Sequence, residues 1–227
     1  MATFALLDQC WVSAKHLAEW DQEGMESALE IVRCAIDPDH QRGGRRLINL
    51  SVVLPDKVVE DFAWTWQSEC LVPESTLALL YSKRFTGFEV KPVSARFLRL
   101  AQKPPKLWEL VPIGWAGMAK AESGIRLDQR ESCPACGYLR YTGLQNPKEL
   151  IDEKIWDGSD FFIVWPMPKY IFISERVGHT ILDNHLTGVR ILSIGDLEKT
   201  ERFTPGRLHY YMPEGRARQL GMPLGIY

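Results

Sequence analysis

Residues 72–93, VPESTLALLYSKRFTGFEVKPV, and residues 173–194, ISERVGHTILDNHLTGVRILSI, align without a gap at an offset of 101 residues. Three pairs are identical, namely Glu74/Glu175, Thr86/Thr187 and Gly87/Gly188. Seven further pairs keep an apolar residue in register: Val72/Ile173, Leu80/Ile181, Tyr81/Leu182, Phe85/Leu186, Phe88/Val189, Val90/Ile191 and Val93/Ile194. Because apolar positions determine which face of a helix or strand is buried, this agreement predicts one structural motif used twice.

Each copy is typical of a short strand, a helix, a Thr-Gly turn and a second strand that alternates apolar and polar residues. The expected strands are residues 69–72 and 88–90 in the first copy and residues 170–174 and 189–191 in the second. Ser174 is placed to cap the second helix, and Gly87 and Gly188 can adopt the left-handed conformation that ends a helix. We therefore expect an α+β fold of two similar strand-helix-strand lobes, with mixed or antiparallel sheets, in a single compact unit.

The rest of the chain divides around these two lobes. The expected segments are a helical and strand segment at 1–60, the first lobe at 61–102, a loop-rich middle at 103–150, the second lobe at 151–200 and a tail at 201–227. We expect a helical segment from about Ser13 to Cys34, broken near Gly24, and strands at Leu47 to Pro55 and Leu107 to Val111. No low-complexity linker separates these segments, so one structural domain is predicted.

Composition excludes several classes of protein. Hydrophobic residues make up 45% and charged residues 25% of the 227, as in a globular chain and not a disordered one. The formal net charge of -2 gives no basic field that would attract nucleic acid or an anionic membrane, and we interpret the basic stretch 42–46 as a solvated turn without a role. No leader-like or membrane-spanning apolar run is evident. Five cysteines, an odd number with one close pair, favour a cytoplasmic location over a secreted disulfide framework.

The sharpest local motif is Cys133-Pro134-Ala135-Cys136-Gly137. Its two-residue gap lets both sulfur atoms face one centre, which makes it half of a zinc site. The best further ligands are Cys34 and His40, which would complete a site with three cysteines and one histidine. Structural zinc sites usually take paired ligands from both sides, so a metal-free knuckle is the favoured interpretation. We expect either no cofactor or one structural zinc ion.

Catalytic motifs are weak by comparison. His179 and His185 are six residues apart and cannot form the i, i+4 pair of a metallohydrolase, and His209 is expected at a strand edge. Cys10 and Cys70 fit buried apolar positions. The sequence holds no nucleophile elbow, phosphate-binding loop or dinucleotide fingerprint.

Four stretches of the chain resemble a known family when they are taken together. These are LVPESTLALLYSKRFTGFEVKPV, PPKLWELVPIGWAGMAKAESGIRL, CPACG and FISERVGHTILDNHLTGVRIL, between about residues 61 and 194. They resemble the double-CXXCG motif family of bacterial immunity proteins, which act against Sit-type and other polymorphic toxins. The family carries a first CXXCG motif in its N-terminal third, where this chain keeps only Cys34 of IVRCAIDPDH.

The resemblance implies a non-enzymatic protein that binds and neutralises one cognate toxin. The alternatives are a zinc-knuckle adaptor or regulatory protein and, in third place, a cysteine-dependent enzyme that uses Cys133 or Cys136. The sequence indicates neither the identity of the toxin nor the oligomeric state.

Overall fold

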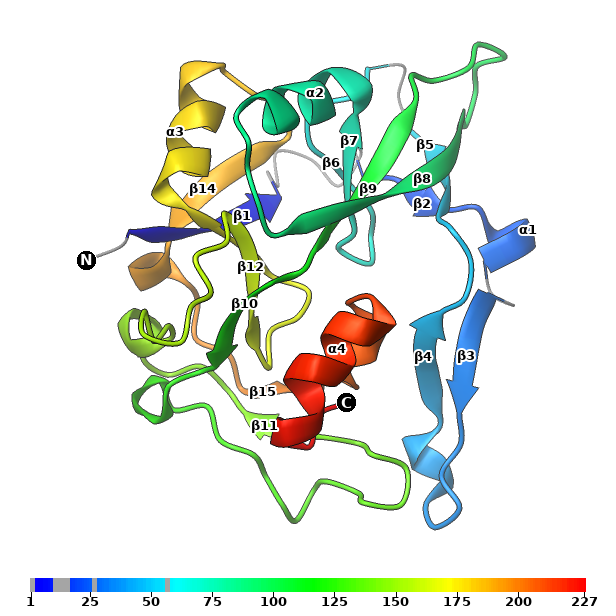
Figure 1. Cartoon of the computed structure of the whole chain (residues 1–227). Coiled ribbons are helices and arrows are strands. Elements are labelled where there is room, and N and C mark those ends of the chain that lie inside the picture. Colours follow the sequence, from blue (N-terminus) through cyan, green and yellow to red (C-terminus); the bar gives the residue numbers. More distant parts are fainter. Residues whose placement is uncertain (1–2, 10–16, 26–27, 56–57) are drawn as a thin grey trace.

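Two mixed β-sheets form the body of the protein in a computed structural model, which describes residues 3–9, 17–25, 28–55 and 58–227 (Figure 1). The five-stranded sheet has the order β10 (Gly114–Met118), β12 (Phe161–Trp165), β13 (Ile171–Ser174), β1 (Phe4–Gln9) and β14 (Val189–Ser193). The six-stranded sheet has the order β2 (Glu19–Trp20), β5 (Ser51–Leu54), β8 (Phe88–Phe97), β9 (Leu107–Pro112), β7 (Cys70–Pro73) and β6 (Ala63–Trp64). One neighbouring pair in each sheet, β10/β12 and β5/β8, is parallel, and the other pairs are antiparallel.

Among the described residues, two small two-stranded sheets and four short α-helices complete the fold. The sheets pair β3 (Leu29–Val32) with β4 (Arg42–Arg46), and β11 (Tyr141–Thr142) with β15 (Arg202–Phe203). The α-helices are α1 (Gln22–Met25), α2 (Glu74–Ser82), α3 (Glu175–Asp183) and α4 (Glu214–Gly221). Short 3-10 helices occupy Pro38–His40, Ala121–Ser123, Pro147–Glu149, Ile194–Asp196, Leu208–Tyr210 and Met222–Leu224. In the part of the chain that is described, no helix has the length and apolar character needed to cross a membrane.

Both predicted strand-helix-strand motifs have the same topology. Helix α2 connects β7 to β8, which are separated in the sheet by β9, a strand antiparallel to both. Helix α3 likewise connects β13 to β14, which flank the antiparallel strand β1. The α+β fold with mixed sheets in one compact unit is therefore confirmed, while the descent of the two motifs from one repeat stays a prediction.

The Thr-Gly turn of each motif binds to an aspartate that precedes the other motif. The amide of Thr86 donates to a carboxylate oxygen of Asp160 over 2.9 Å, and its hydroxyl donates over 3.2 Å. In the same way, the amide and hydroxyl of Thr187 donate to Asp61 over 2.9 Å and 3.0 Å. The two motifs are thus joined by a reciprocal pair of contacts.

The glycines of these turns have a different role from the one predicted. Gly87 and Gly188 have left-handed φ values of 83° and 78°, as expected. The helices, however, have already ended, and Arg84 and His185 hold the left-handed position after each helix, with φ values of 55° and 51°. A Cβ atom on Gly188 would lie 1.9 Å from the carbonyl oxygen of Phe62. The glycines are therefore required because the two motifs approach each other backbone to backbone.

Ser174 occupies the N-cap position of α3, as predicted, but its side chain makes no capping hydrogen bond. Its hydroxyl instead donates to Asp160 over 2.8 Å. The buried carboxylate therefore binds groups from both motifs.

A shared apolar core explains why the two sheets form one unit. One cluster combines residues of both motifs: Leu7, Phe62, Trp64, Cys70, Val72, Leu77, Leu80, Phe85, Leu110, Phe161, Ile171, Ile173, Val177 and Ile181. A second cluster fills the far side of the five-stranded sheet around the fully buried Trp165, and a third lies beneath β5. Burial of this apolar surface is the main stabilising contribution to the fold.

Asp160→Ala is expected to lower the free energy of unfolding by about 3 kcal/mol, because it leaves the buried hydroxyl of Ser174 and the partly buried donors of Thr86 without an acceptor. Asp61→Ala is the matched control, since its hydrogen bonds to Thr187 are solvent-exposed and its contact with the buried hydroxyl of Thr76 is long, at 3.3 Å. Its expected cost is only about 1 kcal/mol. Urea unfolding of both variants measures the difference. Equal costs for the two would contradict the role assigned to the buried carboxylate.

The predicted helix from Ser13 to Cys34 is wrong in the part that is described. Residues 10–16, 26 and 27 lie outside the described residues, but residues 19–20 and 29–32 are strands, and the helix between them spans only Gln22–Met25. Strand pairing of β3 with β4 satisfies the backbone in place of helical hydrogen bonds. The strand predictions at Leu47 to Pro55 and Leu107 to Val111 correspond to β5 and β9.

Candidate metal centre

Four residues from two distant segments meet at the end of the β3–β4 hairpin. Cys34 follows β3, and His40 ends the 3-10 helix that leads toward β4. Cys133 and Cys136 come from the knuckle before β11. The ligand atoms of all four lie within 4.8 Å of one another. They are close enough to bind one metal ion, which is compatible with zinc.

The spacing of the ligand atoms matches a tetrahedral site. The sulfur atoms of Cys34 and Cys133 are 3.7 Å apart, and the sulfur of Cys136 is 3.8 Å from Nδ1 of His40. A tetrahedron with zinc–sulfur bonds of about 2.3 Å has a sulfur–sulfur edge of about 3.8 Å. Two of the ligand-to-ligand distances therefore match a tetrahedral edge, and with all four ligand atoms within 4.8 Å of one another the residues are compatible with a zinc ion.

Backbone amides face the sulfur atoms on both segments. The sulfur of Cys34 accepts from the amides of Ile36 and Asp37, each over 3.4 Å. The knuckle closes through a hydrogen bond of 2.8 Å from the amide of Cys133 to the carbonyl of Tyr138. Gly137, which lies between Cys136 and Tyr138 in the chain, has a left-handed φ of 67°. Such amides stabilise thiolates, which is the form of cysteine that binds metal.

A second layer of contacts orients the ligands. Nε2 of His40 lies 3.4 Å from the carboxylate of Asp37, which leaves Nδ1 toward the sulfur atoms, and the ring stacks on Tyr138 at 4.7 Å. Arg42 donates to the carbonyl of Cys136 over 2.9 Å and to its sulfur over 3.5 Å. Carboxylate partners of this kind fix the tautomer and direction of a ligating histidine.

The pKa values of the three thiols differ: two are lowered and one is raised. Burial opposes ionisation of Cys136, but donors from Arg42 and Tyr138 outweigh it and lower its pKa to about 6. The amide of Cys136 is the main cause of the lowered pKa of Cys133. For Cys34 the two amide donors are outweighed by burial and by its thiol neighbours, and its pKa is raised. A divalent cation would relieve this repulsion and allow all three thiolates to form.

The structure bears on two interpretations of the sequence here. The ligand set Cys34, His40, Cys133 and Cys136 was the less favoured alternative to a metal-free knuckle, yet the fold brings all four together. The basic stretch 42–46 was assigned no role, yet Arg42 binds the knuckle and Arg46 forms a largely buried ion pair with Glu109. Asp37 and Tyr138 were not predicted either; their only signal is proximity in sequence to His40 and Cys136.

The remaining singled-out residues lie elsewhere. His179 is exposed on α3, and His185 is exposed just after it. The strand-edge prediction for His209 is wrong, because the residue lies in a 3-10 helix, where burial lowers its pKa. Cys70 is buried as predicted, and burial raises the pKa of its thiol. Cys10 lies outside the described residues.

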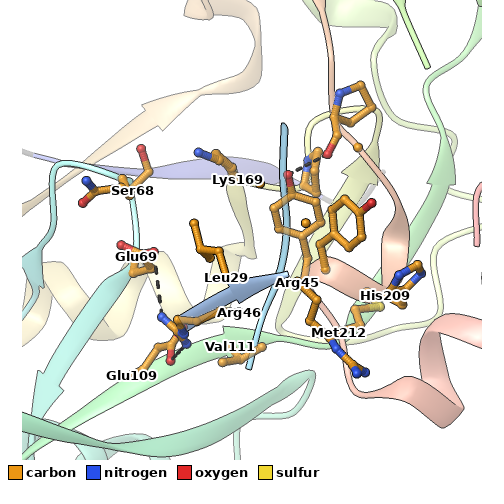
Figure 2. Close-up of a pocket in the computed structure, with 18 of the residues that line it drawn as sticks. Leu29, Arg45, Arg46, Ser68, Glu69, Glu109, Val111, Lys169, His209 and Met212 are labelled. Atoms are coloured by element: carbon orange, nitrogen blue, oxygen red, sulfur yellow. Dashed lines mark hydrogen bonds and ion pairs between the residues drawn. The ribbon is translucent and has the colours of Figure 1, made fainter. Parts of the chain in front are cut away.

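A cavity of about 920 Å³ lies beside this centre, between the β3–β4 hairpin and the body. We call it the hairpin cavity. Its main lining segments are 41–47 on the hairpin, 67–70 and 109–112 on the six-stranded sheet, and 204–206 with 209–214 near the C-terminus. Figure 2 shows Glu69 and Glu109 converging on Arg46. None of the four candidate metal ligands lines it, so the cavity is not a substrate pocket for the thiols.

Neither a family model nor a curated protein matches the chain.

Proposed function

We propose that Cys34, His40, Cys133 and Cys136 bind one structural zinc ion. The observation that carries the proposal is the mutual closeness of the four ligand atoms, at spacings that fit a tetrahedron. Three cysteines and one histidine are a usual ligand set for structural zinc. When bound, the ion cross-links the β3–β4 hairpin to the knuckle.

A structural role is better supported than a catalytic one. Catalytic zinc sites keep one position open for water or substrate, whereas four protein ligands fill a tetrahedral site. A cysteine-dependent enzyme would also use a thiolate with a lowered pKa, as at Cys136. Such an enzyme needs its thiolate to face a substrate pocket, however, and Cys136 does not line the hairpin cavity. We therefore propose a protein without catalytic activity, which keeps its thiols reduced in the cytoplasm.

We further propose that this zinc-stabilised protein is an immunity protein that binds and neutralises a cognate bacterial toxin. The support is the resemblance of its motifs to the double-CXXCG family, together with the position of Cys34 and His40. These two residues lie in the region where the family has its first CXXCG motif. They would be the second pair of ligands, beside the Cys133 and Cys136 pair. Cys34 and His40 would then replace a second cysteine pair in this chain.

Co-expression tests the immunity function. The chain and the toxin encoded beside it are produced together in a sensitive host, with an unrelated toxin of similar potency as the matched control. We expect growth to be rescued only with the neighbouring toxin, and a complex of the two chains to survive purification. Failure of both would refute the immunity function and leave the metal site standing.

A zinc-knuckle adaptor is the second candidate, and the complete four-ligand centre is the observation that favours it. Zinc is expected in both cases, so the partner distinguishes them. The net charge of -2 argues against nucleic acid as that partner. Capture of a host regulatory protein, in the absence of any protection against the toxin, would favour the adaptor.

A further inference from the structure

The β3–β4 hairpin and the segment after it have almost no apolar attachment to the body. No residue from 29 to 49, all of which are described, belongs to any of the three apolar clusters, whereas Ala28 and Leu50 on either side do. Several of its large apolar side chains are exposed, with Ile31 at 60% and Ile36 at 74%, and Leu29 and Val32 are only half-buried. Polar contacts and the metal centre must therefore hold the hairpin in place.

The polar contacts at the base of the hairpin are the first of two attachments of the hairpin to the rest of the protein. The guanidinium of Arg46 forms an ion pair with Glu109 and lies 3.8 Å from Glu69 (Figure 2). These side chains are largely buried, so their charges are poorly screened. Arg45 adds an ion pair of 2.9 Å with Glu214, but both side chains are nearly half exposed, and exposed pairs contribute little.

The second attachment is at the tip of the hairpin, between β3 and β4, where Cys34 and His40 lie close to Cys133 and Cys136 of the knuckle. Within the described residues, the tip contacts the knuckle through the metal ligands, the stacking of His40 on Tyr138, and the hydrogen bonds and cation–π contact of Arg42. Without the ion, no bond would join Cys34 and His40 to the knuckle cysteines, although the sulfur atoms of Cys34 and Cys133 lie only 3.7 Å apart. Removal of the ion therefore weakens the tip far more than the base.

We propose that the metal ion is a clasp that holds the hairpin over the hairpin cavity, so that its loss opens the cavity while the body stays folded. The inference rests on the proposed zinc site and goes beyond it, because a structural zinc need not control access to anything. The hairpin forms one side of the cavity along residues 41–47. When it swings away on the Arg46 base, segments 67–70, 109–112 and 209–214 become accessible to solvent or to a partner.

Hydrogen–deuterium exchange of the full chain, with zinc bound and after chelation, tests the clasp. Zinc content is measured on the same samples. We expect amides in residues 29–47 and 204–214 to exchange roughly tenfold faster or more after chelation, while those in β12, β13 and α3 are unchanged. The near-ultraviolet circular dichroism of the buried Trp64, Trp115 and Trp165 should persist, since these side chains lie in the body.

Two variants at the tip separate metal loss from other effects of chelation. His40→Ala removes a ligand at a position outside the apolar clusters and is expected to show the fast exchange without a chelator. Asp39→Ala is the matched control, because Asp39 is an exposed neighbour that is not among the four ligands, and it should behave as the parent chain.

The other possible outcomes distinguish the clasp from the zinc site. A chain that binds one zinc but exchanges no faster at 29–47 after its removal overturns the clasp and leaves the zinc site intact. Equal acceleration in every element, or loss of the tryptophan signal, also overturns it, because the ion would then support the whole fold. A chain that never binds zinc overturns both proposals.

Discussion

Cys133→Ser is expected to abolish stoichiometric zinc binding and to lower the free energy of unfolding by about 3 kcal/mol or more. The serine hydroxyl is not ionised at neutral pH and is a poor zinc ligand, so the tetrahedral set loses a corner. Cys34, His40 and Cys136 then no longer share a cation, so the cross-link between the hairpin and the knuckle is lost. For a chain of this length the melting temperature should fall by about 10 °C.

The measurement is zinc per chain by elemental analysis, together with thermal unfolding in the presence and absence of added zinc. Cys70→Ala is the matched control, since Cys70 is a fully buried cysteine that is remote from the centre in β7. It should keep one zinc per chain and lose only the small packing contribution of a sulfur atom. If the parent chain bound no zinc, or if Cys133→Ser bound as much as the parent, the metal centre would be refuted.

Gly188→Ala is expected to lower the free energy of unfolding by about 3–5 kcal/mol. Its φ of 78° disfavours alanine, and the added Cβ would lie 1.9 Å from the carbonyl oxygen of Phe62, a contact that only backbone movement can relieve. Gly87→Ala should behave alike, because its Cβ would lie 2.1 Å from the carbonyl oxygen of Phe161.

Gly158→Ala separates the two causes of this loss. Gly158 has a φ of 83°, close to that of the turn glycines, but a Cβ there would meet no atom within 4 Å. Its expected cost is about 1 kcal/mol, which comes from the backbone conformation alone. Urea unfolding of the three variants gives the comparison. Similar losses at all three positions would mean that the close approach of the two motifs contributes nothing.

Local pattern was sufficient to predict the two strand-helix-strand motifs. Leu80 and Ile181, for example, recur at positions that the core buries, each 3% exposed or less, whereas the in-register pair Tyr81 and Leu182 is exposed. The insertion of β9 and β1 between the strands of each motif was not predictable in this way. Pairing between strands far apart in the chain depends on tertiary packing, which leaves no local period in the sequence.

The β3–β4 hairpin was missed for a different reason. β4 reads RGGRR, which lacks the β-branched and aromatic residues that indicate a strand. The position of the hairpin is instead fixed by contacts with residues distant in the sequence, such as Arg46 with Glu109 and His40 with Tyr138 of the knuckle. The spacing of Cys133 and Cys136 identified half of the metal centre. Cys34 and His40 could be named only by elimination, and the orienting residues Asp37 and Arg42 depend on side-chain directions that the sequence does not encode locally.

The place of β1 in the five-stranded sheet has a consequence for synthesis of the chain. β1 pairs on one edge with β13, where Phe4 lies opposite Ser174, and on the other with β14, where Gln9 lies opposite Val189. Both partners leave the ribosome long after β1 does. β1, which includes the apolar residues Leu6 and Leu7, therefore stays unpaired until residues 171–193 have been synthesised. Until then it is accessible to chaperones and to other nascent chains. Because pairings this far apart in sequence are slow to form, closure of this sheet is expected to be the last step of folding.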